Sequence, residues 1–371
     1  LDLERARGAL RRVDARDVHD SSGAAAAPAL DSAEGVLRYQ RYVQLFNIEC
    51  WLGPLGDATF PTAMAPLHPE EARALIALHG GEGEAEALEA AAASLTAVAE
   101  RLQAKMDDMG AGAGCMVKTS SRSAKDHTEL AGVRRRVEGL LAAFPARDEN
   151  ALLVALSYAS MEMLCVSDAR RVVDSFVRSE RIWNDMHLAL AHEEHWAESL
   201  VARRWVHLEP DMEFRCFVAG GRLTAASQYR HLVCFPRLLA LGAQLREGLL
   251  AFVEGTVQPR LAGVFPEDRY VADLAVELCG GSASNVLQED PPADLALGRW
   301  WCIEVNPFFE TTDGCLFSWS RERDLLEGRR DGGAAPFEFR LQERRKKGGL
   351  SLVYGEWKAA VEGLLESRGD A

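Results

Sequence analysis

The sequence predicts an α+β protein, with irregularly alternating helices and strands and mainly antiparallel pairing among the strands of its second half. Three observations predict this class. The first half contains amphipathic helical patterns, the second half contains apolar runs rich in β-branched and aromatic residues, and Gly220 and Gly221 separate two of those runs as a hairpin turn would. The chain lacks the regular βαβ series that a parallel sheet would require.

Helices are expected where apolar residues recur at helical spacing. Residues 69–79 begin with a proline and a glutamate and are followed by two glycines, an order typical of the start and end of a helix. The next pattern has apolar residues at spacings of seven, three, four and four, namely Leu88, Leu95, Val98, Leu102 and Met106. A further helix is expected within residues 167–182.

Strands are expected where short apolar runs are bounded by turn residues. They fall near 115–117 and within 198–208, 213–229, 269–278 and 299–306. The 19 residues from 280 to 298 have no strong periodicity and would connect the last two strands as a loop. If those two strands pair around this loop, they are antiparallel neighbours.

Composition and charge narrow the possible functions. The 371 residues are 48% hydrophobic and 26% charged, which is ordinary for a globular protein. The formal net charge of −14 excludes a global positive field that would recruit nucleic acid or an anionic membrane. The eight cysteines are scattered without a CxxC pair, a pattern typical of reduced thiols in a cytoplasmic protein. Nucleic acid and membrane are therefore not expected as partners.

Three polar residues interrupt the last two apolar strands. Glu304 and Asn306 are two positions apart, so they share one face of a strand, and Asp273 lies inside the preceding strand. Polar residues at a strand end are often the solvated start of a loop, and a single buried acid can be hydrogen-bonded or lie at an edge. Oxygen ligands from neighbouring strands also suit Mg²⁺. A magnesium site at Asp273, Glu304 and Asn306 is thus one of two interpretations.

A basic loop offers phosphate contacts. Lys118 and Lys125 flank "TSSRSA", a run of hydroxyls and small residues that includes Arg122. The alternative is an ordinary polar surface loop. Glu213 and Arg215 share a strand face, where they would form either a surface ion pair or, through the arginine, a phosphate clamp. The preceding "GAGAG" has neither the Rossmann nor the P-loop spacing, so those two nucleotide folds are not predicted.

Taken together, these segments resemble a known family. "RRWVHLEPDMEFRCFVAGGRLTAASQY", "YVADLAVEL" and "CIEVNPFFETTDGCLFSW", preceded by "VKTSSRSAKD", are similar to the signature segments of the cell division cycle protein 123 family. The resemblance covers roughly residues 45–330. It implies an ATP-grasp fold, in which two α+β subdomains clasp a nucleotide. The implied organisation is a loose lead-in (1–42), a partly helical N-terminal region (43–110), an N-subdomain (111–205), a C-subdomain with the metal site (206–330) and a C-terminal tail (331–371).

The resemblance also implies cofactors and site residues. It implies ATP with Mg²⁺, metal ligands at Asp273, Glu304 and Asn306, and ATP contacts at Lys118, Lys125, Glu213 and Arg215, with an adenine hinge near Arg204 and Trp205.

The sequence departs from the family at three places. The family usually has aspartate at Glu304, asparagine and tryptophan at Ser120 and Ser121, and arginine at Tyr229. The first is conservative for Mg²⁺, whereas the others alter the pocket.

Family members act as ATP-binding assembly chaperones of eukaryotic translation initiation factor 2 and contact its gamma subunit. The resemblance therefore implies a cytoplasmic chaperone with this partner. The wider fold suggests an alternative, an ATP-dependent ligase that joins a carboxylate to an amine, with a polynucleotide ligase as a weaker option. Whether the chain is an enzyme stays open at this point.

Overall fold

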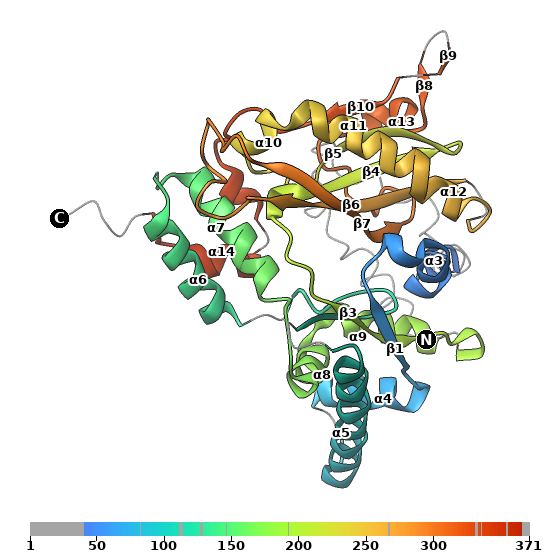
Figure 1. Ribbon diagram of the computed structural model, residues 1–371. Coiled ribbons are helices and arrows are strands. Elements are labelled where there is room, and N and C mark those ends of the chain that lie inside the picture. Colours follow the sequence, from blue (N-terminus) through green and yellow to red (C-terminus); the bar gives the residue numbers. More distant parts are fainter. Residues whose placement is uncertain are drawn as a thin grey trace, which may run out of the picture.

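The computed structural model describes residues 41–81, 83–110, 114–126, 129–145, 147–191, 193–265, 268–330, 333–334, 336–353 and 355–365. Within these ranges the chain forms a three-stranded sheet, a five-stranded sheet and a two-stranded ribbon, together with helices. The two larger sheets lie one below the other in Figure 1. The predicted α+β class is confirmed. Apart from residues 41 and 42, the predicted lead-in lies outside the described residues.

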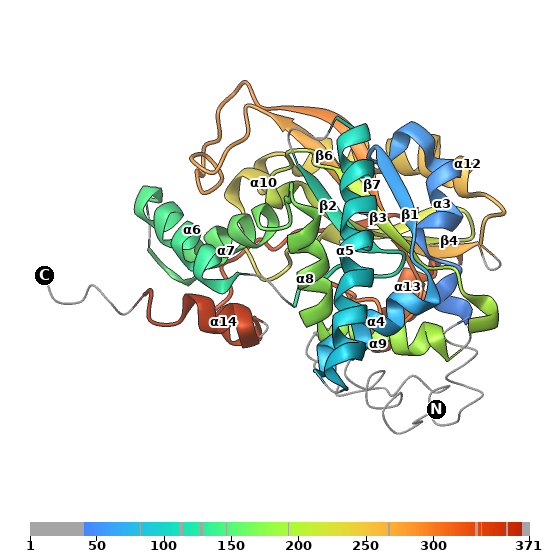
Figure 2. The ribbon, with the colours of Figure 1, turned by 90° about the horizontal axis from the view of Figure 1, so that it is seen from below.

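The smaller sheet is covered on one face by helices. Its strands run in the order β1 (Thr62–Pro66), β3 (Ser199–Arg204), β2 (Cys115–Thr119), all antiparallel. The covering helices are α4 (Pro69–Gly80), α5 (Ala85–Asp108), α8 (Ala169–Arg178) and α9 (Glu180–Leu190). Figure 2 shows α5 lying across this sheet. The predicted stripe of α5 is confirmed, since Leu95, Val98 and Leu102 are buried in the core between helix and sheet.

The larger sheet has the strand order β10-β5-β4-β6-β7. These strands are β4 (Glu213–Ala219), β5 (Arg222–Gln228), β6 (Arg269–Cys279), β7 (Ala296–Asn306) and β10 (Glu338–Arg340). The predicted hairpin is confirmed, because Ala219 pairs with Arg222 across Gly220 and Gly221, whose φ angles of 57° and 68° are those of a primed turn. The predicted antiparallel pairing of the last two long strands is confirmed as well.

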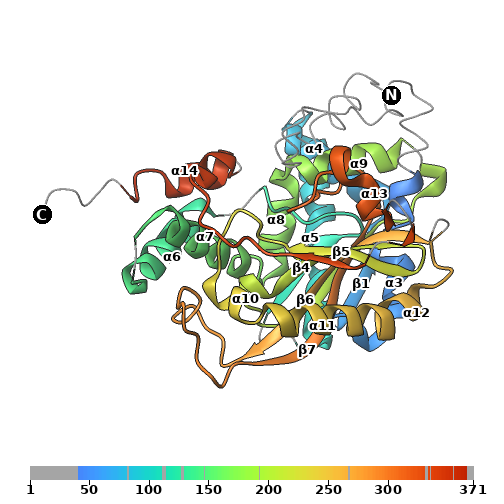
Figure 3. The ribbon, with the colours of Figure 1, turned by 90° about the horizontal axis from the view of Figure 1, so that it is seen from above.

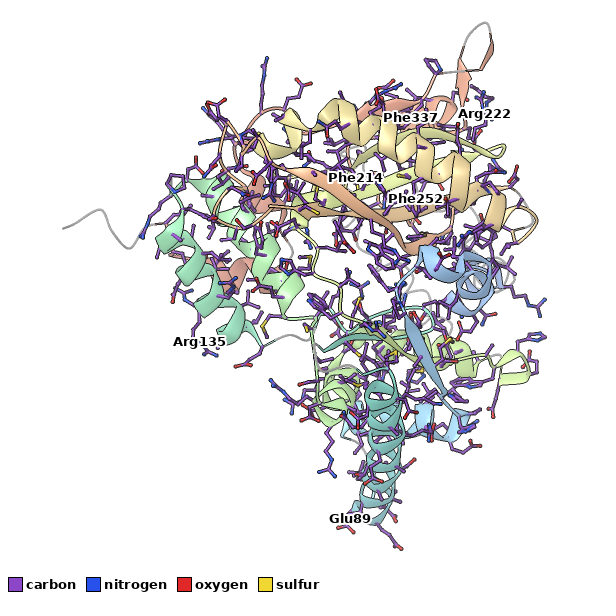
Figure 4. The ribbon with its side chains drawn as sticks, viewed as in Figure 1. Glu89, Arg135, Phe214, Arg222, Phe252 and Phe337 are labelled. Atoms are coloured by element: carbon purple, nitrogen blue, oxygen red, sulfur yellow. The ribbon has the colours of Figure 1, made fainter. Side chains whose placement is uncertain are left out.

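One face of the larger sheet packs on helices α10 (Pro236–Ala240), α11 (Gly242–Phe252) and α12 (Gln258–Leu261), as Figure 3 shows. Phe214 from the sheet and Phe252 from α11 are both labelled in Figure 4. Their ring centroids lie 6.4 and 6.0 Å from the centroid of the Trp300 ring. Gly248 permits this close packing, because a Cβ there would lie 2.4 Å from a Trp300 ring carbon. The helical layer thus leaves the opposite face of the sheet turned toward the smaller sheet.

Further segments complete the larger core. Helix α3 (Ile48–Leu55), the pair α6 (Leu130–Ala143) and α7 (Glu149–Glu162), and α14 (Gly355–Val361) contribute buried side chains to the same cluster as the sheet. Strand β10 lies within the region predicted as a C-terminal tail and pairs in parallel with β5. Helix α13 (Trp319–Leu326) and the ribbon strands β8 (Arg329–Arg330) and β9 (Gly333–Ala334) lie between β7 and β10 in the chain. In the described part of the chain, no helix is both long enough and apolar enough to cross a membrane.

Candidate functional site

The strand register places the polar residues predicted from the sequence on one face of the larger sheet. Arg215 pairs with Asp273, Asp273 pairs with Glu304, and Val271 pairs with Asn306. Directly paired residues project from the same face of a sheet, and residues two apart on a strand also share a face. The side chains of Arg215, Asp273, Glu304 and Asn306 therefore line the face that the α10–α12 layer leaves uncovered.

A bulge in β7 keeps this alignment. The pairing shifts after Asp273, so that Leu274 pairs with Cys302 and Ile303 has no directly paired residue. Without the extra residue, Glu304 could not share the face of Asp273 while Cys302 is buried against the helices. The bulge thus aims the carboxylate of Glu304 at the smaller sheet.

Asp273 forms the centre of a compact polar group. Its two carboxylate oxygens accept hydrogen bonds from Arg215 Nε and Nη2 at 2.8 and 2.9 Å, and Oδ2 also accepts one from Asn306 Nδ2 at 3.1 Å. Both Arg215 and Asp273 are buried. The ion pair expected between Glu213 and Arg215 is not formed. Glu213 instead lies 3.9 Å from Arg230, because the strand pairing presents Arg215 directly to Asp273.

Glu304 makes the contact that joins the two sheets. Its carboxylate pairs with the ammonium group of Lys118 on β2, and the Lys118 side chain is buried. Burial alone would raise the pKa of Glu304, but the positive charges of Lys118, Lys125 and Arg203 lower it to about 2. Glu304 is therefore an anion at neutral pH and is available as an oxygen ligand.

Lys125 contributes a second, incompletely neutralised ammonium group. Burial is the largest influence and lowers the pKa of Lys125, while the nearby carboxylates of Glu304 and Glu213 raise it. Among the described residues, Lys125 has no carboxylate within ion-pair distance. Arg181 and Arg230 add positive charge around it. A partly buried cation without a close anion favours the entry of an anionic group.

Arg203 is a site residue that the sequence patterns did not indicate. It projects from β3 on the same face as Lys118, donates a hydrogen bond to the Ile303 carbonyl of the other sheet, and donates another to Thr59 Oγ1 at 2.6 Å. Its guanidinium lies 4.7 Å from the Phe60 ring centroid. Burial lowers the pKa of Arg203 to about 10, which still leaves it charged at neutral pH. Lys118 and Arg203 thus fix the position of one sheet over the other.

The predicted phosphate loop is held by carboxylates from other elements. Ser120 donates to Glu49 of α3, and Ser121 donates to Asp185 of α9 at 2.6 Å. Arg122 also pairs with Asp185, at 3.1 Å. These distant acids could not be assigned to the loop from local spacing. They show what the two serines do here, where the family usually has asparagine and tryptophan.

The predicted hinge residues have a different environment from the lysines. Arg204 follows Arg203, so its side chain lies on the helix-covered face, where Nη2 donates to the Met109 carbonyl at 3.2 Å. The backbone N–H groups of Arg204 and Trp205 donate to Pro61 and Gly114 at 2.8 and 3.0 Å. This segment is the direct connection between the two sheets, and its role in binding adenine stays a prediction.

Tyr229 occupies the third position at which the chain departs from the family. Its ring lies against Arg215, with the guanidinium carbon 4.9 Å from the ring centroid. Burial raises the pKa of Tyr229, so the side chain is neutral. An uncharged aromatic ring therefore stands where an arginine would add a further positive charge. Arg230, the next residue, is only partly buried, and its positive charge acts on Lys125.

The assembled group has two chemical properties. Asp273, Glu304 and Asn306 supply only oxygen donors toward a hard cation, and this is the donor chemistry that Mg²⁺ requires. Lys118 of β2, Lys125 in the loop after β2 and Arg215 of β4 supply positive charge from both sheets, as phosphate binding requires. The residues present thus fit a metal and a polyphosphate side by side on the facing surfaces of the two sheets.

The fold defines the class of the protein as an ATP-grasp-like α+β protein. The chain superimposes on the solved structure of Cdc123 from Schizosaccharomyces pombe with a TM-score of 0.52, over 82% of this chain and 98% of that one, at 19% sequence identity. At this identity the likeness establishes the fold alone.

The chain belongs to the D123 family, whose model matches residues 164–352, just over half of the chain. It is 35% identical over 121 residues to cell division cycle protein 123 of Eremothecium gossypii, a match that covers 33% of this chain and 28% of that protein. It is 28% identical over 127 residues to the translation initiation factor eIF2 assembly protein of Xenopus laevis, covering 34% of this chain and 31% of that protein. The matched segments thus span less than a third of these relatives. The predicted family is confirmed.

Proposed function

We propose that the chain binds ATP with Mg²⁺ on the facing surfaces of its two sheets and, in that state, assists the assembly of translation initiation factor eIF2 by holding its gamma subunit. One observation carries the nucleotide part. Three oxygen donors, Asp273, Glu304 and Asn306, lie on the face from which Arg215 projects, and Lys118 reaches that face from the other sheet.

Bound Mg²⁺ would neutralise part of the phosphate charge and leave the protein to position the rest. Lys118 would exchange its ion pair with Glu304 for a phosphate oxygen, which releases the Glu304 carboxylate for the cation. Lys125 would supply the second ammonium contact. Since Arg215 is already held by Asp273 and by the Asp313 carbonyl at 2.8 Å, it would present its charge without reorganisation.

The partner part of the proposal is supported by the names of relatives and by the family resemblance. Tyr229 favours binding over catalysis. A ligase depends on positioned charge around the reacting phosphate, and here a neutral ring replaces a charge that the family usually has.

The test uses the whole chain in two assays. Calorimetry should detect ATP binding that is much weaker without Mg²⁺. Immobilised chain should retain purified eIF2 gamma subunit more strongly with Mg²⁺ and ATP than without them. Failure of ATP to bind would overturn the nucleotide proposal, whereas ATP binding without retention of the gamma subunit would overturn only the partner.

The ligase alternative is tested by product release. Under the proposal, ATP with Mg²⁺ stays largely intact over hours, and amino acids, small peptides or RNA ends do not accelerate its turnover. Multiple-turnover release of ADP or AMP that depends on one of these additions would identify an enzyme and reject the chaperone.

A further inference from the structure

We propose that His231, Asp313 and Cys315 form a second metal site, specific for a borderline-soft divalent cation such as Zn²⁺. His231 lies in the loop after β5, and the other two residues lie in the loop after β7. One nitrogen, one carboxylate oxygen and one sulfur from these side chains all lie within 4.8 Å of one another. The site is distinct from the oxygen-only group at Asp273, Glu304 and Asn306 and does not depend on nucleotide binding.

The donor types decide which cation suits the site. Imidazole nitrogen, thiolate sulfur and carboxylate oxygen are the ligands that Zn²⁺ takes in proteins, whereas Mg²⁺ and Ca²⁺ take oxygen ligands. His231 is buried while Asp313 and Cys315 are partly exposed. Three protein ligands with one side toward solvent leave the fourth tetrahedral position for a water molecule or an incoming group.

A backbone carbonyl orients the histidine ring. Its Nδ1 lies 3.4 Å from the carbonyl oxygen of Tyr229. In the tautomer that carries its proton on Nδ1, this contact is a hydrogen bond, and the lone pair of Nε2 can then bind a metal. Such a bond from the other ring nitrogen to a backbone carbonyl is the usual way in which a metal-binding histidine is oriented.

The loop after β7 holds the other two ligands in place. Asp313 Oδ1 accepts a hydrogen bond from the backbone N–H of Cys315 at 2.8 Å. Gly314 between them is required for close packing, since a Cβ there would lie 2.3 Å from the Phe317 carbonyl oxygen. Cys315 has a φ of +54°, a conformation that it shares with only one other non-glycine residue in the described ranges. The loop thus presents the thiol and the carboxylate together.

Metal binding would connect this site to the nucleotide face. The Cys315 sulfur lies 3.7 Å from the Tyr229 carbonyl, and the Tyr229 ring packs on Arg215. Arg215 in turn donates to the Asp313 carbonyl at 2.8 Å. A cation held by the two loops would therefore restrain Arg215 from two sides. The thiol proton would be released to solvent when the metal–sulfur bond forms.

The test measures zinc binding to the whole chain after treatment with a chelator. We expect one Zn²⁺ per chain by competition with a chromophoric chelator. Cys315→Ser and His231→Gln should each weaken binding by at least the ~10–100-fold that loss of an outer-shell partner causes. The matched control is the double variant Cys50→Ser and Cys279→Ser, which removes the two exposed thiols and should bind Zn²⁺ unchanged.

A second measurement keeps the proposal testable if these variants do not fold. In the wild-type chain, Zn²⁺ should slow the alkylation of Cys315 several-fold, as read by peptide mass spectrometry, and should leave Cys50 reactive. Zinc binding that survives Cys315→Ser, that is lost in the exposed-thiol control, or that leaves Cys315 unprotected would overturn the proposal.

Discussion

Arg237 and Arg215 each pair with buried carboxylates in the same half of the molecule, but their surroundings differ. Arg237 of α10 is fully enclosed and binds Asp211 at 2.6 Å and Glu209 at 2.9 Å. Its remaining donors bind the Ser282 carbonyl and the Asn285 side chain, and Tyr158 of α7 donates to Glu209. Each of the groups in this centre is paired within the larger core.

The Arg215 centre also pairs an arginine with a buried carboxylate, but its outermost contact is with the other sheet. Its carboxylate partner Asp273 accepts from Asn306, and beside it Glu304 reaches a lysine of the other sheet, with 34% of the Glu304 side chain exposed. A closed network stabilises one packing arrangement, whereas a network that ends at a neighbouring sheet can exchange a contact for a ligand. The boundary of the network, and not its residue types, therefore distinguishes a structural centre from a candidate site.

The largest effect is expected at the closed centre. Arg237→Met should lower the free energy of unfolding by about 3–5 kcal/mol, because it leaves Asp211 and Glu209 buried without their cation. Urea denaturation measures the change. The control is Arg135→Met on the exposed surface of α6 (Figure 4), where 70% of the side chain is exposed and a change within about 0.5 kcal/mol is expected. A loss below about 1 kcal/mol for Arg237→Met would contradict the structural role.

A pair of matched aspartate variants separates stability from binding. Asp273→Asn should weaken binding of ATP with Mg²⁺ by roughly 100-fold, since the amide keeps an acceptor for Arg215 but loses the charge that a metal needs. Asp211→Asn should lower stability and leave the ATP affinity of the folded fraction unchanged. Calorimetry and urea denaturation on both variants give the comparison. Equal loss of affinity in the two variants would mean that the two centres do not differ in function.

The open centre was largely predictable from the sequence, and its connections to the other sheet were not. The i, i+2 spacing of Glu304 and Asn306 and the antiparallel pairing with the strand of Asp273 are local properties, and they place all three on one face. Arg203 looked like an ordinary strand residue, because its partner Ile303 lies 100 positions away and only the packing of the sheets brings them together.

The same limit applies to segments around the site. The acids Glu49 and Asp185, which hold the serines of the phosphate loop, lie 71 and 64 positions from them. Strand β10 was assigned to a tail because a three-residue strand carries too little periodicity to recognise. Local pattern therefore predicts which face a side chain occupies, whereas the partner that it meets depends on tertiary packing.

A smaller effect is expected at the contact between the sheets. Lys118→Ala should weaken ATP and ADP by about tenfold, the size of one charge-assisted contact, and should barely affect adenosine, which has no phosphate. Calorimetry with the three ligands measures this difference, and Lys346→Ala, at an exposed position, is the control. Equal weakening of all three ligands would indicate a disrupted pocket and not a lost phosphate contact.

The smallest effect concerns Glu198, a second carboxylate near Lys118. Its pKa is raised, whereas that of Glu304 is lowered. Glu198 is 8% exposed, and its Oε2 atom has no hydrogen-bond partner within the part of the chain that the structure describes. Burial, followed by the charges of Asp185 and Glu49, raises the pKa of Glu198 well above its ordinary value of 4.5. Glu304, by contrast, is held ionised by Lys118, so the two glutamates near one lysine should respond to pH in opposite directions.

The raised pKa of Glu198 determines how the stability of the folded chain changes with pH. Below pH 4.5 both the folded and the unfolded chain carry the proton, and the group has no effect on stability. Above that pH the unfolded chain loses the proton first, so the contribution of Glu198 to the free energy of unfolding falls as pH rises toward the folded pKa.

The variant Glu198→Gln has no proton to lose at this position. The stability of the variant relative to wild type should therefore rise between pH 4 and 8, by less than the ~1–3 kcal/mol cost of an unsatisfied buried group. Urea denaturation across this range, with Glu89→Gln at the exposed end of α5 (Figure 4) as a flat control, measures the change. A difference between Glu198→Gln and wild type that stays constant with pH would mean that Lys118 ionises both glutamates, and the contrast between them would then disappear.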